Sequence, residues 1–280
     1  MTDDLRIRNY ATRTIETYIG RVARFAQHFG RSPERLGPEH IRSYQLFLIE
    51  EKKASWAVFN QTVCALRFLY ETTLGRADVI QHIPFPKQPR KLPVVLSVDE
   101  VERFLQAVSN LKHRTVLETM YASGVRLSEA LNLRVGDLDS SRSLIRVEQG
   151  KGRKDRYTLL SSTLLERLRD YWKRCRPSSY LFPGQRADQP LSPTVIQRAC
   201  PIARLEARIS KRVTTHTMRH CFATHLLEAG VDLRTIQVLM GHGSLNTTAR
   251  YLHIVSGAVQ SRRGAVDLLQ AAHAKDPSRP

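Results

Sequence analysis

The stretch HTMRHCFATHLLEAG, residues 216–230, gathers side chains that could do chemistry. His216, Arg219 and His220 are spaced three or four residues apart, so on a helix they share one side. This arrangement suits three roles: a metal site, a solvated helix face, or a pocket that binds an anion. These residues alone leave all three open.

A metal site is the weakest of the three alternatives. A zinc metalloprotease needs glutamate directly after the first histidine, whereas Thr217 follows His216 here, and no carboxylate lies between His216 and His225. Arg219, in the middle of the cluster, would repel a divalent cation. We therefore expect neither a metal nor another cofactor.

The charge of the chain favours an anionic partner. Its 280 residues include 44 Lys and Arg against 26 Asp and Glu, a net charge of +18. Such an excess repels itself unless something negative binds it, so nucleic acid is expected, with an anionic membrane as the alternative. No run approaches the roughly 18 apolar residues of a membrane span, and MTDDLRIRNYATR lacks the apolar core of a secretory signal. A cytoplasmic protein is predicted, with its four separated cysteines reduced.

Further reactive side chains recur along the second half of the chain. Arg126 stands in YASGVRLSEAL, Lys151 in QGKGRKDR, His242 in LMGHGSLNTT and Tyr251 in TARYLH. Each has an ordinary alternative. Arg126 and Glu129, for example, could form an i, i+3 ion pair on a helix, which contributes only a few tenths of a kcal/mol. Taken singly, such residues are more often surface or core positions than parts of a site.

Hydrophobic spacing predicts the elements that must position these residues. Residues 1–83 are expected to form a small helical unit, with helices at 15–29, from Pro38 to 48 and at 59–69. The segment PFPKQPRKLP, with four prolines, three basic residues and no acid, cannot be helical. Residues 84–95 are therefore predicted to be an interdomain linker.

The second unit, residues 96–274, is expected to be mostly helical with one small sheet. Ser97 and Glu100 form a capping-box start, and SLIRVEQ and RYTLL are typical of two strands joined by the turn GKGRKD. Residues 275–280 are expected to be a frayed tail. The predicted fold class is mainly α with a small antiparallel β-sheet in the carboxyl-terminal domain. Further helix boundaries are expected at Ser192, Gly230, Asp232 and Gly241.

The motifs, taken in order, resemble those of the tyrosine recombinases, or phage integrase family, most closely the compact Xer-like and integron-integrase members. The ordered set is G-hydrophobic-R-hydrophobic-S-E-A-L, a GKG turn, H-x-x-R-H with FATHLL after it, LMGH, and Tyr251 nine residues past that histidine. The likeness covers nearly the whole chain. Met218 and Cys221 depart from the leucine and the small residue usual in the family. The lack of a long insertion before His216 argues against an integron integrase.

The resemblance implies roles for four of these residues in phosphate chemistry. Arg126 and Arg219 would clamp the scissile phosphate, and Tyr251 would attack it. Guanidiniums can fork onto nonbridging oxygens as charge develops in the transition state, which lysine cannot do. Fixed cations also favour the phenolate of a hydroxyl whose ordinary pKa is about 10, and His216 would accept its proton.

The same resemblance implies two further catalytic residues, Lys151 and His242, and one supporting residue, Glu129. Lys151, flanked by glycines on the hairpin turn, would protonate the departing 5′ oxygen, with Lys154 as a rival. His242 would complete the pocket. Glu129, one helical turn from Arg126, would brace it.

The implied protein is a two-domain, C-shaped DNA clamp that acts as a site-specific recombinase. It would cleave and rejoin double-stranded DNA through a 3′-phosphotyrosyl intermediate, without ATP or metal, in integration, excision or transposition of a mobile element. The alternatives are strand relaxation like that of a type IB topoisomerase, and a DNA-binding architectural protein without catalysis. The family also implies a tetramer on two duplexes, with residues 255–274 docked in trans or in cis, and allows for an accessory recombinase or DNA-bending protein.

Overall fold

The computed structural model describes residues 1–81, 83–87, 92–148 and 155–252. It divides into two compact units, Met1–Arg90 and Lys91–Pro280, and the division falls within the predicted linker. Residues 84–87 and 92–95 of that linker contain neither helix nor strand. The predicted docking segment 255–274 and tail 275–280 lie outside the described residues.

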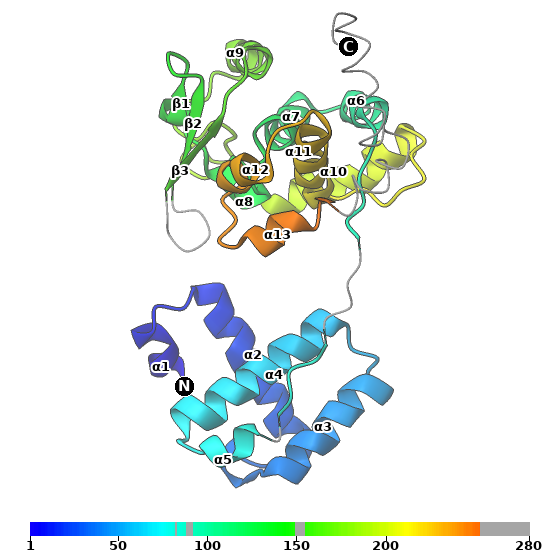
Figure 1. The fold of residues 1–280 in the computed structure, drawn as a ribbon. Helices are drawn as coiled ribbons and strands as arrows, with labels where there is room; N and C mark the ends of the chain where they lie inside the picture. The colour runs from blue at the N-terminus through cyan, green and yellow to red at the C-terminus, as the bar shows by residue number, and fades with distance from the viewer. Residues whose placement is uncertain (82, 88–91, 149–154, 253–280) are drawn as a thin grey trace, which may run out of the picture. The chain divides into compact units, whose positions relative to one another are not determined.

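The described part of the first unit is helical (Figure 1). The three predicted helices are confirmed, and α2 packs on α4 around a core that includes Phe25, Leu66 and Tyr70. The helices are α1 (Thr2–Ile7), α2 (Thr12–Phe29), α3 (Pro38–Glu50), α4 (Trp56–Phe68) and α5 (Ala77–Ile80), with short turns at η1 (Pro33–Arg35) and η2 (Leu69–Thr73). The sequence did not indicate α1 or α5 because four to six residues are too few to show a helical period.

The second unit begins with three helices and a small sheet. The helices are α6 (Val98–Gln106), α7 (Leu111–Ser123) and α8 (Leu127–Asn132), followed by the single turn η3 (Val135–Asp137). The strands β1 (Leu138–Asp139), β2 (Leu144–Val147) and β3 (Arg156–Leu159) pair antiparallel in the order β1-β2-β3. The predicted hairpin is thus confirmed, and the two-residue strand β1 was missed.

Five more helices complete the described part of the second unit. They are α9 (Ser162–Cys175), α10 (Pro193–Glu206), α11 (Thr215–Glu228), α12 (Leu233–Met240) and α13 (Leu245–Ala249). The predicted boundaries hold: Ser97 caps α6 with Glu100, Asp232 caps α12, and Gly241 ends α12 in the left-handed conformation. The predicted fold class, mainly α with a small antiparallel sheet, is confirmed.

Helix α11 lies at the centre of this unit, in contact with α7, α10 and α12 (Figure 1). Its side chains Met218 and Cys221 are fully buried in the main core. Arg219, between them in sequence, is also buried, at 4% exposure. The central position of α11 therefore forces a charged side chain into the interior, where it needs partners.

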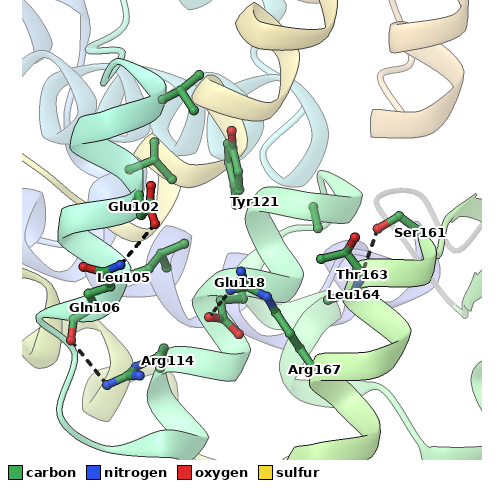
Figure 2. Close-up of a pocket in the computed structure, with 13 residues that line it drawn as sticks. Glu102, Leu105, Gln106, Arg114, Glu118, Tyr121, Ser161, Thr163, Leu164 and Arg167 are labelled. Carbon is green, nitrogen blue, oxygen red and sulfur yellow. Dashed lines mark hydrogen bonds and ion pairs between the residues drawn. The ribbon is translucent and has the colours of Figure 1, made fainter.

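A cavity of about 450 Å³ lies between α6, α7 and α9 (Figure 2). Within it, Arg167 Nη1 is 2.6 Å from Oε1 of the buried Glu118. None of the residues that line this cavity is a predicted site residue. The cavity is therefore separate from the site described below.

Across the described ranges, no helix combines the length and the apolar character that crossing a membrane would require. All four cysteines are free, as expected, and Cys200 and Cys221 are buried.

Candidate active site

Five of the predicted site residues line one pocket of about 200 Å³ in the second unit. Lys151 and its rival Lys154 lie outside the described residues. Glu129 does not line the pocket but is bonded to Arg126. The lining residues are Arg126, His216, Arg219, His220, His242, Gly243, Thr247, Arg250 and Tyr251.

Helix α11 presents its histidines and arginine to the pocket from one side, as their spacing predicts. Thr214 begins the helix, and its N–H donates to Thr217 Oγ1 at 3.0 Å. The ring centres of His216 and His220 are 6.4 Å apart, and both rings line the pocket together with Arg219. The motif therefore delivers three nitrogen-bearing side chains to one place.

The third histidine of the motif has other partners. His225 Nδ1 is 2.9 Å from the Tyr121 hydroxyl, and its Nε2 is 2.9 Å from the carbonyl oxygen of Leu96. His225 therefore does not join His216 and His220 around a common point. In the part of the chain that the structure describes, no three His, Cys, Asp or Glu side chains are grouped to hold a metal ion.

Arg219 is held by two backbone carbonyls. Its Nη1 donates to Gly124 O and its Nη2 to Met240 O. Burial, and then the positive charge of Arg126, lower the pKa of Arg219 to about 9, so the guanidinium remains charged at neutral pH. Position 124 requires glycine, because its φ is +67° and a Cβ there would overlap the Phe222 ring.

Arg126 is fixed by Glu129, which is buried rather than exposed. Arg126 Nη1 is 2.7 Å from Glu129 Oε1, and the Arg126 backbone N–H donates to Oε2 at 2.8 Å. The Glu129 side chain is only 6% exposed. The i, i+3 ion pair is therefore present, but its carboxylate is buried and its arginine lines the pocket.

A third arginine, which the sequence did not single out, completes this network. Arg156 donates to both oxygens of Glu129, from Nη1 at 3.0 Å and from Nη2 at 2.7 Å. Burial alone would raise the pKa of Glu129, but hydrogen bonds from Arg156 and Arg126 lower it to about 2. The only sequence signal for Arg156 was its place at the start of a predicted strand, RYTLL, which is no sign of a site.

The carboxyl-terminal end of α12 receives all three arginines. Arg156 Nε donates to Leu239 O at 3.2 Å, Arg219 Nη2 to Met240 O, and Arg126 Nη2 to Gly241 O at 3.3 Å. Carbonyls at a helix end lack intrahelical partners and carry partial negative charge. The carbonyl oxygens at the end of α12 thus hold three guanidinium groups near one another.

The pKa values of the two predicted histidines, His216 and His242, are both lowered, which favours their neutral forms. Burial, and then the charges of Arg219 and Arg126, lower the pKa of His242 to about 3. The same causes lower the pKa of His216. His242 Nδ1 is 2.9 Å from Thr248 Oγ1, which links the residue after the end of α12 to α13. A neutral imidazole can donate a hydrogen bond or accept a proton.

Tyr251 is 2% exposed, and its ring lies in a small core cluster with Phe222, Ile236 and Met240. Its hydroxyl is 2.9 Å from Nδ1 of His220. Burial raises the pKa of Tyr251, although nearby arginines, Arg219 first, oppose this rise. The tyrosine is thus both a core residue and a member of the pocket.

Two neighbours of Tyr251 were not predicted. His220 lies in the quoted motif without an assigned role, although its spacing from His216 placed it on the same helix face. Arg250 also lines the pocket and directly precedes the tyrosine. The expected proton acceptor was His216, whereas the histidine that is hydrogen-bonded to the hydroxyl is His220.

Two family models and several named proteins match this chain over most of its length. The model described as the phage integrase family matches residues 94–256, and the phage integrase N-terminal SAM-like domain matches residues 1–78. The protein named "Putative integrase/recombinase y4qK", from Sinorhizobium fredii, is 48% identical over 100% of this chain and 92% of its own length. The tyrosine recombinase XerA of Pyrococcus horikoshii is 32% identical over 90% of this chain and 87% of its own.

Solved structures have the same fold. The crystal structure of XerA recombinase matches 100% of this chain and 97% of its own, with 28% identity and a TM-score of 0.53. That of XerH site-specific recombinase, in a post-cleavage complex with difH substrate, matches 95% of this chain and 81% of its own, with 22% identity and a TM-score of 0.72.

Proposed function

This chain belongs to the phage integrase family and is a tyrosine-type site-specific recombinase; on that premise, we propose that Tyr251 is the nucleophile that breaks the DNA strand. Attack of its oxygen on a DNA phosphorus would form a 3′-phosphotyrosyl bond and release a free 5′ hydroxyl. A 5′ hydroxyl from a partner strand would then attack that bond, release Tyr251 and restore the phosphodiester. Because the bond energy is conserved at each step, the reaction needs no ATP.

The main support for this proposal is that Arg126, Arg219 and Tyr251 line one pocket. A guanidinium has five N–H donors, and the bonds of each arginine to other described residues use only part of this set. The remaining donors are available to nonbridging phosphate oxygens. Fixed donors of this kind stabilise negative charge as it grows in the transition state.

The proposal also needs a path for two protons. The phenolic proton of Tyr251 would pass to a neutral imidazole, and His216 is the proposed acceptor, with His220 as its competitor because it already bonds the hydroxyl. Lys151 would return a proton to the departing 5′ oxygen. His242 would donate a hydrogen bond to the phosphate, and Glu129 would keep Arg126 in place.

We propose double-stranded DNA at a recombination site as the substrate, and integration, excision or transposition of a mobile element as the task. The net charge of +18 supports a polyanionic partner. The XerH structure contains its difH substrate, which supports a similar use of this fold. We further propose that the two units close as a clamp around the duplex, that four protomers act on two duplexes, and that residues 255–274 join neighbouring protomers.

The test uses a duplex that the protein selects from a random-sequence library, nicked near its centre so that cleavage releases a short fragment and traps the adduct. A covalent protein–DNA adduct is expected with the wild type and not with Tyr251→Phe. Joining of two different labelled duplexes would distinguish recombination from the relaxation expected of a topoisomerase. DNA binding without any adduct would refute the proposed chemistry and leave the architectural alternative.

A further inference from the structure

We propose that Arg156 is a positioning residue. It keeps the guanidinium of Arg126 in the orientation that the phosphate requires, through its bonds to Glu129 and to the end of α12. This inference rests on the proposed function, since it concerns how the proposed phosphate clamp is aligned. Arg156 does not line the pocket. It therefore acts through Arg126 rather than on the DNA.

The first support for this role is the sharing of Glu129 by two arginines. The carboxylate accepts from Arg126 Nη1 at 2.7 Å and from both terminal nitrogens of Arg156, at 3.0 and 2.7 Å. The side chains of Arg156 and Glu129 are 11% and 6% exposed. A two-pronged pair between such buried groups fixes the plane of the carboxylate, and so the direction in which Arg126 must lie to meet it.

The second support is the contact of Arg156 with the other anchor of Arg126. Arg126 Nη2 donates to Gly241 O at 3.3 Å, and Arg156 Nε donates to Leu239 O two residues earlier. A Cβ added at Gly241 would lie 2.7 Å from Arg156 Cδ. Arg156 therefore touches both groups that fix Arg126: the carboxylate of Glu129 and the backbone at Gly241.

The third support is the balance of charge. Among the described residues, Arg126, Arg156 and Arg219 all lie within 4.0 Å of the carboxylate of Glu129, Arg219 being the farthest. With Arg156 present, the one negative charge of Glu129 is shared between Arg126 and Arg156, so it neutralises Arg126 only in part. Without Arg156, Glu129 would neutralise more of the charge of Arg126, with only Arg219 left nearby, and Arg126 would stabilise the growing charge of the transition state less strongly.

Arg156 connects the sheet to two helices of the site. It is the first residue of β3, and Arg156 pairs with Val147 in the register of the β2–β3 ladder. The same side chain reaches α8 through Glu129 and α12 through Leu239. Arg156 thus ties the sheet to the two helix ends that present Arg126 and His242.

The experiment compares Arg156→Met and Arg156→Lys with the wild type on the nicked duplex at saturating protein. We expect adduct formation to slow about 10- to 100-fold in Arg156→Met, because small misplacements of a catalytic group have effects of this size. Arg156→Lys keeps the charge without the fork, and we expect an intermediate rate. The Kd for the intact duplex should change less than about threefold, because Arg156 does not line the pocket.

The matched control is Arg167→Met. Arg167 forms an ion pair with the buried carboxylate of Glu118 in the cavity between α6, α7 and α9 (Figure 2). This variant therefore also removes the arginine partner of a buried carboxylate, but away from the pocket. Its thermal stability should fall while its cleavage rate stays within about twofold of the wild type. A merely structural role of Arg156 would make Arg156→Met behave in the same way.

A substrate with a methylphosphonate at the cleaved position separates positioning from folding. The methyl group removes one charged nonbridging oxygen, so the reaction depends less on a well-placed Arg126. The deficit of Arg156→Met relative to the wild type should therefore shrink on this substrate. If the rate deficit of Arg156→Met were as large on the methylphosphonate as on the phosphodiester, the inference would be overturned. It would also be overturned if Arg156→Met slowed cleavage as much in a Glu129→Gln background as in the wild type, because the two residues would then act independently.

The outcomes also separate this inference from the proposed function. If the wild type forms no Tyr251-dependent adduct on the phosphodiester duplex, the proposed function fails. If the wild type forms the adduct and Arg156→Met does so at the same rate, only the role of Arg156 fails.

Discussion

The hydroxyl of Tyr251 and Nδ1 of His220 lie 2.9 Å apart, so the proposed nucleophile is hydrogen-bonded to a histidine of α11. Both residues lie mostly out of solvent, and the tyrosine ring packs on Phe222 and Met240. The proposed nucleophile is thus also a member of a small hydrophobic core.

The first prediction concerns the strength of this bond. His220→Leu leaves the buried hydroxyl without a partner and should destabilise the second unit by about 1–3 kcal/mol. His220→Asn can place an amide oxygen near the position of Nδ1 and should cost less. Urea unfolding, followed by Trp172 fluorescence in a Trp56→Phe background, would report on the second unit, because these are the only two tryptophans in the chain.

The control for this prediction is Tyr251→Phe, which has no hydroxyl to leave unpaired. In that background His220→Leu should cost about 1 kcal/mol less than in the wild type. Equal costs in both backgrounds would show that the hydrogen bond contributes nothing to stability.

The second prediction concerns arginine geometry. Arg126→Lys and Arg219→Lys should each slow adduct formation by at least about 100-fold, because lysine keeps the charge but loses the fork. Arg219→Lys should also lower the thermal stability more, since Arg219 is 4% exposed and bonds two buried carbonyls. Single-turnover cleavage and thermal unfolding would test both points. Adduct formation by Arg219→Lys at the wild-type rate would remove this arginine from the proposed clamp.

The third prediction concerns Gly241. Its φ of +62° and the 2.7 Å from an added Cβ to Arg156 Cδ mean that Gly241→Ala strains the backbone and displaces Arg156. We expect a loss of about 1–2 kcal/mol of stability together with slower cleavage. Thermal unfolding and adduct formation on the nicked duplex would measure the two effects.

The control is Gly230→Ala, at φ +90° with nothing within 4 Å of the added Cβ. It also places alanine at a positive φ but displaces no side chain, so its stability should fall while cleavage continues at the wild-type rate. Similar cleavage by the two variants would mean that the contact between Gly241 and Arg156 has no functional effect.

The fourth prediction concerns pH. Burial, and then the neighbouring His216, lower the pKa of His220 from 6.5 to about 4. Between these values the unfolded chain binds more protons than the folded one, so stability falls as the pH drops below about 6.5. His242, whose pKa is about 3, and Glu129, whose pKa is about 2, act in the same direction, the carboxylate only below about pH 4.5.

The expected contribution of His220 is on the order of 1–2 kcal/mol between pH 7.5 and pH 5. Urea midpoints at the two pH values would measure it, and His220→Leu should show a smaller decline than the wild type. An identical decline in the two proteins would mean that His220 is already protonated in the folded state or does not titrate in this range.

Much of the secondary structure could be predicted from local patterns. The three main helices of the first unit, the capping box at Ser97, the stop at Gly241 and the β2–β3 hairpin all follow from spacing within a short window. The short elements α1, α5 and β1 could not be predicted, because two to six residues contain too little of a repeat. The Arg126–Glu129 pair was predicted as well, but not its burial.

Sequence alone determined which chemical groups are available: a tyrosine, arginines that fork, imidazoles on one face of a helix, and a strong positive charge. Only the tertiary structure decided which of them meet. Arg156 joins Glu129 across 27 positions, and His220 joins Tyr251 across 31. Such long-range contacts depend on how helices and strands pack, whereas a sequence pattern reports only neighbours on one element. The pocket members were largely predicted because their ordered motifs resemble those of a known family, while the residues that hold them in place became visible only in the fold.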